Sequence, residues 1–376
     1  MKKTNNKEVF PEGLKVLLPE DARKEEHITR RINDFFYKNG YQPVKTPLME
    51  YEKKERSEFF NPSEQDSFML VEPETKKVLV LRSDITAQVA NLASSKLKSY
   101  NRPLRLCYSG EVLRNSKNIY QTDRQFKQIG AEIIGAPGNK GLIEIIDITV
   151  SVLKNLNINN INIDFSLPSI SRYIDSSVNF ETKIGRKVKE SIDNKDISLI
   201  KSKKYDYING IINLSGPINN LKMNLKKYIF PKEIKHIIKK FFLIYNELNK
   251  KIPKLNITID MTEGKSFLKY KNLGFKIYNK DNASVIAIGG DYMINEKESG
   301  LGISLMINKI SDVMHYSSEK RVYVPYKNNN TRFLNKFKNK IFVKELFPNK
   351  NSLVEAKKQS CFYILTKQGK LEKIKK

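Results

Sequence analysis

Two segments, RLCYSGEVLRN (residues 105–115) and RQFKQIGAEIIGA (residues 124–136), decide the fold of this chain. Both are rich in apolar residues, and a polar stretch lies between them, so they predict two strands joined by a polar loop. Side chains alternate between the two faces of a strand, and we therefore expect Arg124, Gln128 and Glu132 on one face with isoleucines on the other. The predicted hairpin has one polar face and one apolar face.

The polar face of this hairpin is suited to a small charged molecule. A guanidinium, an amide and a carboxylate follow one another along the second strand, and Gly130 leaves space between them. The carboxylate would hold an ammonium group, and an arginine would hold a carboxylate or a phosphate. The alternative is an exposed ion pair between Arg124 and Glu132, which would contribute only about 0–1 kcal/mol. The pattern is compatible with both interpretations.

The patterns before the hairpin predict two helices, an extended segment and a pair of short strands. In chain order they are a helix at 21–40, an extended segment at 41–53, two strands within 67–84 and a helix at 83–97. Asp21 and Ser83 are placed to cap the two helices, and Gly40 is placed to end the first one. Pro43 and Pro47 favour the edge of a sheet for the extended segment.

The patterns after the hairpin predict a core, an insertion and a small terminal module. In order they are a helix at 141–156, a strand at 160–166, a mostly helical insertion at about 165–252, strands at 255–261, 275–279 and 284–290, a helix at 302–314, and alternating strands and helices from 321. We expect an α+β fold, a mostly antiparallel sheet flanked by helices. The expected domains are a core at 1–320 and an α/β module at 321–376.

Composition restricts the class of protein. The chain has 376 residues and a formal net charge of +27, and no apolar run approaches the roughly 18 residues that a membrane span requires. The start MKKTNNKEVFPEG has no apolar core, so we expect no secretory signal and a cytoplasmic protein. The positive charge suggests a polyanionic partner, or a generally basic surface with lysines spread along the chain. We favour the basic surface and expect no nucleic-acid partner.

The sequence offers no reactive constellation. It has no GxSxG, P-loop, HExxH or strand-associated GxGxxG motif, and its two cysteines and three histidines have no metal-ligand spacing. We therefore expect no catalytic residue, metal or cofactor. Asp84 stands at a helix start, where it could cap the helix or bind a ligand, and Thr86 could add a hydroxyl group. The polar face predicts a site that binds without reacting.

Taken in order, these segments resemble the catalytic core of histidyl-tRNA synthetase, which has the class II aminoacyl-tRNA synthetase fold. The segment LPEDARKEE…INDFFYKNGYQPVKTPLMEY is similar to its dimer-forming first motif, and LRSDITAQVA is similar to its amino-acid-binding loop. The opening hairpin resembles the second motif. SVIAIGGDY and the expected helix at 302–314 take the place of the third.

The departures from the synthetase pattern fall mainly on ATP chemistry. Arg114 is followed by Asn115 and Ser116, where the synthetase has an acid two residues after its arginine. The arginine of the third motif, which holds the ATP phosphates, aligns with Lys309. The histidine-recognition segment is KSFLKY (265–270), which keeps only its last tyrosine, and GGRYD is GGDYM. These losses imply that adenylation is lost.

The chain is more similar to the synthetase-like regulatory subunits of ATP phosphoribosyltransferase. That resemblance implies a non-catalytic subunit of histidine biosynthesis that forms a dimer, joins a short-form catalytic subunit in a hetero-octamer, and responds to L-histidine. The histidine-binding candidates that it implies are Asp84, Thr86, Arg114, Gln128, Glu132 and Tyr270. A divergent histidyl-tRNA synthetase and a tRNA-binding relic of one are the alternatives.

Overall fold

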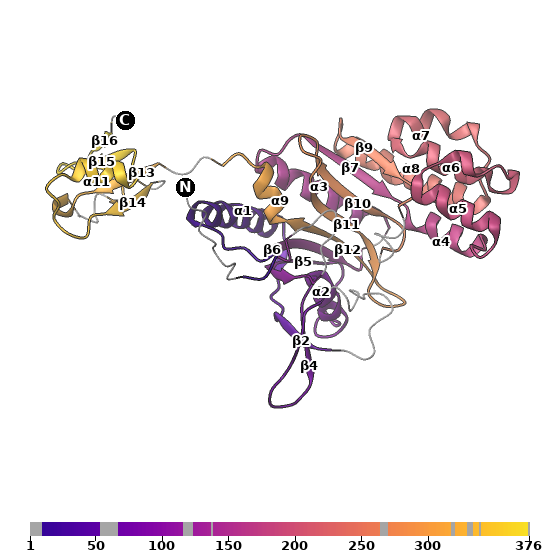
Figure 1. Ribbon diagram of the computed structural model, residues 1–376, viewed down its shortest axis with the longest axis horizontal. Helices are drawn as coiled ribbons and strands as arrows, with labels where there is room; N and C mark the ends of the chain where they lie inside the picture. Colours follow the sequence, from indigo (N-terminus) through magenta and orange to yellow (C-terminus); the bar gives the residue numbers. More distant parts are fainter. Residues whose placement is uncertain are drawn as a thin grey trace, which may run out of the picture. The chain divides into compact units, whose positions relative to one another are not determined.

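The structure is a computed structural model that describes residues 10–52, 67–115, 123–136, 138–263, 270–316, 320–328, 334–337 and 340–374. The chain divides into two compact units, Met1–Met314 and His315–Lys376. The first unit is built on a large mixed sheet with helices on both faces, as the predicted α+β class requires (Figure 1).

The central sheet has nine strands, and its middle is antiparallel. In spatial order the strands are β1 (Gln42–Pro43), β5 (Leu104–Leu113), β6 (Gln125–Ile134), β12 (Ser299–Met306), β11 (Val285–Met293), β10 (Gly274–Asn279), β7 (Ile161–Ser166), β9 (Asn256–Asp260) and β8 (Gly216–Pro217). Only the β1–β5 and β7–β9 pairs are parallel among these. The predicted hairpin is confirmed as β5 and β6, which pair along their full lengths.

The apolar face of the sheet is covered by four of the described helices. Helices α1 (Pro19–Lys38), α3 (Lys140–Asn155), α8 (Lys232–Lys251) and α9 (Ile307–Val313) lie on this side. Ile129 and Ile133 of β6 are at most 1% exposed there, and Phe165 of β7 packs edge-on against Phe241 of α8. Helix α2 (Ile85–Ser94) lies on the other face, where Val89 and its neighbours cover part of the hairpin.

The predicted helix ends are partly confirmed. Helix α1 begins after Leu18, which makes no side-chain cap, so Asp21 lies inside the first turn and does not cap the helix. Gly40 does end α1: it has φ +82°, and its N–H donates to Tyr37 O while the next N–H donates to Phe36 O. Helix α2 is capped by Asp84, and the prediction of Ser83 was wrong by one residue.

The predicted helix at 302–314 was wrong over its first half. Residues 299–306 form β12, and only Ile307–Val313 are helical. Alternate residues of β12 face opposite sides, so Ile303 enters the apolar core while Gly302 lies beside Glu132 of β6. A Cβ at Gly302 would lie 1.8 Å from a Glu132 carboxylate oxygen, so a larger residue there would displace the Glu132 side chain.

A smaller sheet projects from the first unit next to α2. It consists of β2 (Met49–Tyr51), β4 (Val78–Leu81) and β3 (Met69–Val71) in that spatial order. Strand β4 is followed after two residues by Asp84, the cap of α2. The extended segment predicted at 41–53 is thus divided between the edge of the large sheet and this small one.

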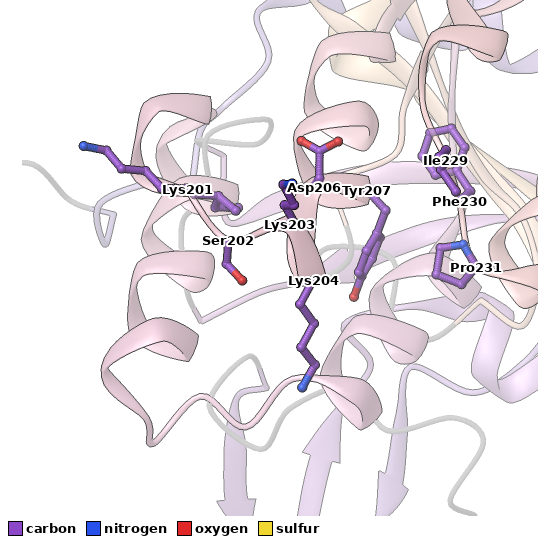
Figure 2. Close-up of a pocket in the computed structure, with 10 residues that line it drawn as sticks. Lys201, Ser202, Lys203, Lys204, Asp206, Tyr207, Ile229, Phe230 and Pro231 are labelled. Atoms are coloured by element: carbon purple, nitrogen blue, oxygen red, sulfur yellow. The ribbon is translucent and has the colours of Figure 1, made fainter.

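The insertion between β7 and β9 is mostly helical, as predicted. It comprises α4 (Pro168–Ser177), α5 (Lys183–Asn194), α6 (Asp206–Leu214), α7 (Ile218–Asn224) and α8, with short 3-10 turns η2 (Ile197–Leu199), η3 (Lys203–Tyr205) and η4 (Leu225–Lys227). These elements gather at the β9 end of the sheet (Figure 1). Within the insertion, residues 200–204, 206–207 and 229–231 line a pocket (Figure 2).

The second unit contains a four-stranded sheet with its own core. Its spatial order is β14 (Ile341–Lys344), β13 (Arg321–Val324), β15 (Tyr363–Leu365) and β16 (Leu371–Lys373), and α11 (Ser352–Lys358) joins β14 to β15. Val322, Val324 and Leu365 are fully buried in it. The helix predicted within 330–340 falls largely outside the described residues.

Candidate functional site

A polar site forms where the start of α2 meets β6 and β12. Asp84 Oδ1 accepts hydrogen bonds from Thr86 N (2.9 Å) and from Gln128 Nε2 (2.9 Å). Gln128 Nε2 also donates to Ser304 Oγ (2.7 Å), and Gln128 Oε1 accepts from Ile85 N (2.9 Å). Gln128 is only 2% exposed, so this side chain fixes the helix start to the sheet.

The carboxylate of Glu132 is the centre of a second group of hydrogen bonds. It is 0% exposed and accepts from Tyr292 OH (2.8 Å) and Tyr108 OH (3.4 Å). Tyr108 OH also lies 2.8 Å from Thr86 Oγ1 and 3.1 Å from Ser304 Oγ, which joins the two groups into one network. Burial, and then the charge of Glu132, raise the pKa of both phenols well above 10.0, so both hydroxyls stay protonated and donate.

The interpretation of Arg124 and Glu132 as an exposed ion pair is excluded. Glu132 is fully buried, and Arg124 Nη2 donates to Asn115 Oδ1 (2.7 Å) while its guanidinium lies over the Phe68 ring. The space that Gly130 was expected to leave for a ligand is used by Tyr108, whose hydroxyl would lie 2.2 Å from a Cβ at that position. The polar face is therefore a buried network.

Glycines form the floor beside Glu132. Strand register places Glu132, Gly302, Gly290 and Gly274 opposite one another on β6, β12, β11 and β10. A Cβ at Gly290 would lie 2.5 Å from the Tyr270 ring, so that ring packs against the floor. Between them lies a cavity of about 10 Å³ lined by Thr86, Tyr270, Ile288, Tyr292, Gly302, Ile303 and Ser304. Such a volume corresponds to about one water molecule.

Tyr270 is 6% exposed and lines the cavity beside Glu132. Its carbonyl oxygen accepts a hydrogen bond from Arg172 Nη1 (3.1 Å). Asp291, the aspartate of GGDYM, accepts from the backbone N–H groups of Asn272 (2.9 Å) and Leu273 (2.7 Å), so it shapes the turn after Tyr270. The remaining part of the expected recognition segment, 265–269, lies outside the described residues.

Arg114 lies at the edge of the site. Its Nε donates to Ser83 O (3.1 Å), and its guanidinium lies over the Phe126 ring at 5.1 Å. Ser83 immediately precedes the cap of α2, so Arg114 supports the loop that carries Asp84. This contact places the arginine near the polar network of Asp84, Gln128 and Glu132.

Lys309 lies on α9, near Asp123. Asp123 pairs with Lys15 (2.5 Å), accepts from Asn308 Nδ2 (2.9 Å) and interacts electrostatically with Lys309. Burial opposes ionisation of Asp123, but the hydrogen bonds from Lys15 and Asn308 outweigh it and lower the pKa. The lysine is thus near a carboxylate that already has partners.

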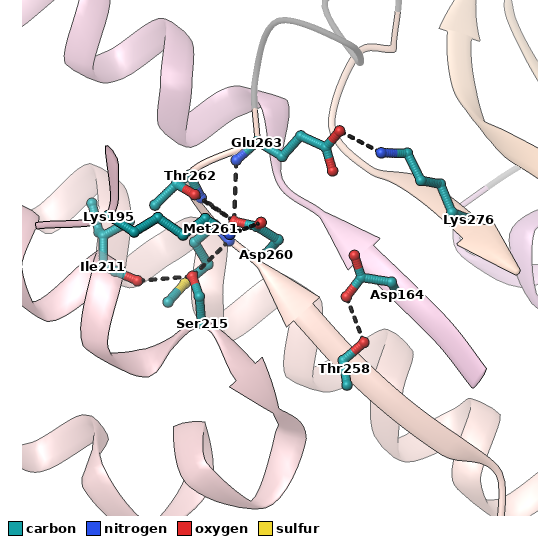
Figure 3. A network of polar contacts seen from close by, with 10 residues as sticks. All are labelled: Asp164, Lys195, Ile211, Ser215, Thr258, Asp260, Met261, Thr262, Glu263 and Lys276. Carbon is teal, nitrogen blue, oxygen red and sulfur yellow. Dashed lines mark hydrogen bonds and ion pairs between the residues drawn. The ribbon is translucent and has the colours of Figure 1, made fainter. Parts of the chain in front are cut away.

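A separate polar network lies on the same sheet face, at its β9 end (Figure 3). Lys276 is 1% exposed and ion-paired with Glu263, and Asp164 accepts from Thr258 Oγ1 (2.5 Å). Burial, and then the charges of Asp260 and Glu263, raise the pKa of Asp164. Lys195 at the end of α5 pairs with Asp260 (2.7 Å), which attaches the insertion to the sheet.

Three residues of the site were absent from the prediction: Tyr108, Tyr292 and Ser304. Tyr108 pairs with Gly130 in the hairpin, so knowledge of how the two strands align would have identified it as a site residue. Ser304 was missed because its segment was predicted as a helix and is a strand.

Within the described residues no group of three or more His, Cys, Asp or Glu could hold a metal ion. No helix among the described residues is long and apolar enough to span a membrane.

Comparison with known proteins places the fold. The ATP phosphoribosyltransferase regulatory subunit of Paramagnetospirillum magneticum is 25% identical over 99% of this chain and 100% of its own length. A Bacillus halodurans structure described as an ATP phosphoribosyltransferase regulatory subunit/histidyl-tRNA synthetase has a TM-score of 0.78 at 19% identity, covering 97% of this chain and 99% of that one. A chain of the ATP phosphoribosyl transferase complex of Thermotoga maritima has a TM-score of 0.58 at 20% identity, covering 75% and 97%.

The family model described as histidyl-tRNA synthetase matches residues 13–310. That range includes the nine-stranded sheet, α2 and the polar network around Gln128 and Glu132. The chain belongs to the histidyl-tRNA synthetase family.

Proposed function

We propose that this chain is the regulatory subunit of ATP phosphoribosyltransferase, and that it serves the first step of histidine biosynthesis in the cytoplasm without catalysing a reaction. The observation that carries the proposal is the buried network of Asp84, Gln128 and Glu132, which has the groups for an amino acid. Its support among relatives is a curated regulatory subunit that aligns with 99% of the chain.

The proposal includes the loss of synthetase chemistry. Lysine at position 309 is a point charge, and it cannot give the paired, planar hydrogen bonds by which arginine holds phosphate oxygens. Arg114, the arginine of the second motif, donates to Ser83 O and stacks on Phe126, and the acid that follows it in a synthetase is replaced. The groups that would stabilise charge on ATP are therefore weakened, while the amino-acid groups remain.

L-histidine is the effector in this proposal. The carboxylates of Asp84 and Glu132 would hold its ammonium or imidazole, Gln128 and Thr86 would fix its orientation, and Arg114 stands near the loop that precedes Asp84. The cavity of about 10 Å³ has no room for an amino acid, so side chains that line it must move when histidine binds. Tyr270 packs over the glycine floor and is the ring with the most direct effect on that space.

The proposed partner is the short-form catalytic subunit, in a hetero-octamer built on dimers of this chain. The test is to mix the purified chain with that transferase, measure phosphoribosyl transfer and titrate histidine. We expect activation on mixing and inhibition by histidine. Unchanged transferase activity on mixing would refute the proposal.

A divergent histidyl-tRNA synthetase is the second candidate, because the matching family model is that of the synthetases. This function requires histidine-dependent exchange of pyrophosphate into ATP by the chain alone. We expect no exchange above background, and exchange at a synthetase-like rate would favour this candidate.

A further inference from the structure

The insertion contains a pocket that no step of the proposed histidine response uses. It lies between residues 200–207, which include η3 and the start of α6, and the segment 229–231 (Figure 2). Its volume is about 620 Å³. Pockets that enclose a ligand or several side chains typically have about 300–1,000 Å³. The volume is therefore sufficient for a substantial binding partner.

The inner surface of this pocket is apolar. Ile200, Tyr207 and Phe230 line it and are 7%, 8% and 4% exposed. Ile229 lies beside them and is 86% exposed, so a partner could cover it. An apolar group that entered the pocket and covered Ile229 would be stabilised because both apolar surfaces are removed from water.

The rim of the pocket is basic. Lys201, Lys203 and Lys204 line it together with one acid, Asp206. They belong to an insertion in which residues 168–251 hold 18 Lys and Arg against 8 Asp and Glu. In Figure 2 the side chains of Lys201 and Lys204 extend in different directions. They can meet separate carboxylates around the rim, and they do not converge on one phosphate group.

The same features argue against nucleic acid as the occupant. Bases of single strands stack on exposed aromatic rings. Tyr207 and Phe230 are almost completely buried, and the exposed apolar side chain here is an isoleucine. Charge and shape thus match an acidic protein segment with one apolar side chain better than they match RNA.

We propose that this pocket, defined by residues 200–207 and 229–231, docks an acidic segment of a partner protein whose apolar side chain enters between Tyr207 and Ile229. The inference rests on the proposed function, in which that partner is the catalytic transferase subunit. Carboxylates of the segment meet the separate lysines of the rim and speed association at low salt, while the apolar side chain slows dissociation.

The experiment measures binding of the purified short-form transferase to the full chain. One variant combines Lys201→Glu, Lys203→Glu and Lys204→Glu, and a second carries only Ile229→Asp. We expect each to raise the dissociation constant about 10-fold or more, which is about 1.4 kcal/mol. The triple variant is also expected to lose the acceleration of association at low salt that the unaltered chain shows.

Matched controls carry the same changes elsewhere in the insertion. Lys235, Lys239 and Lys240 are exposed on α8, and Met223 on α7 is 79% exposed, and none of them lines the pocket. Lys235→Glu with Lys239→Glu and Lys240→Glu, and separately Met223→Asp, should leave binding within about twofold of the unaltered chain. Melting curves of all variants verify that each is folded.

The outcomes separate the two proposals. If the unaltered chain binds and activates the transferase and the pocket variants bind as tightly as their controls, the docking inference is overturned while the proposed function stands. If the unaltered chain neither binds nor activates the transferase, both are overturned. Pocket variants that lose RNA binding but keep transferase binding would also overturn the inference, because nucleic acid would then be the occupant.

Discussion

Replacing Gln128 with alanine tests whether one side chain supports both the fold and the effector site. The substitution removes the bonds to Ile85 N, Asp84 Oδ1 and Ser304 Oγ at 2.9, 2.9 and 2.7 Å. Asp84 keeps its hydrogen bond from Thr86, and Ser304 keeps its contact with Tyr108. The backbone N–H of Ile85 is therefore the group most affected by the loss of the Gln128 side chain. A buried group without its partner costs about 1–3 kcal/mol, and we expect a total loss of about 2–4 kcal/mol.

The expected loss is measured by thermal unfolding with and without histidine. At about 2–4 °C per kcal/mol, the value for domains of about 150–250 residues, the melting temperature should fall by about 4–16 °C. Histidine at 100 times its dissociation constant should stabilise the unaltered chain by about 2.7 kcal/mol. In Gln128→Ala the dissociation constant should rise about 10- to 100-fold, because charge-assisted hydrogen bonds in the site contribute about 1.5–3 kcal/mol.

Gln88 on the same helix is the matched control. It is 6% exposed, accepts from Thr46 Oγ1 (2.6 Å) and donates to Pro47 O (3.1 Å), away from the polar network. Gln88→Ala should lower the melting temperature and leave histidine affinity unchanged. Equal histidine affinity in Gln128→Ala and the unaltered chain, or equal weakening by both substitutions, would refute the reasoning.

Three further predictions concern the same sheet. Gly302→Ala should displace the Glu132 carboxylate and destabilise the chain by about 1–3 kcal/mol in denaturant titrations; a variant as stable as the parent would contradict the crowding at this position. The free energy of unfolding should fall as pH rises above about 10, because tyrosines in the unfolded chain then ionise while the buried phenols stay protonated. Tyr292→Phe should reduce the slope of unfolding free energy against pH by about 1.4 kcal/mol per pH unit, and an unchanged slope would contradict the burial argument. Asp164 has a raised pKa, so its ionisation costs stability above the usual value of 3.8, and Asp164→Asn should stabilise the chain at about pH 7 but not at about pH 3.

The hairpin and its polar face were predictable because a period of two is a local property of the sequence. Gln128 and Glu132 follow from that period alone. Tyr108 does not, because its position next to Glu132 depends on how β5 and β6 align. The segment GISLMI has apolar residues at spacings that suit either a strand or a helix, and only pairing with β6 and β11 decides for the strand. Ser304 was missed for that reason.

The row of glycines on β12, β11 and β10 has a consequence for selectivity. At that level three adjacent strands present only backbone, so the floor has the same shape and polarity whatever small molecule lies above it. In the proposed histidine site, discrimination between amino acids would then depend on the walls, which are Glu132 and Tyr292 on one side and Thr86 and Tyr270 above. A different effector could be selected by substitutions in those walls while the backbone beneath them is left as it is.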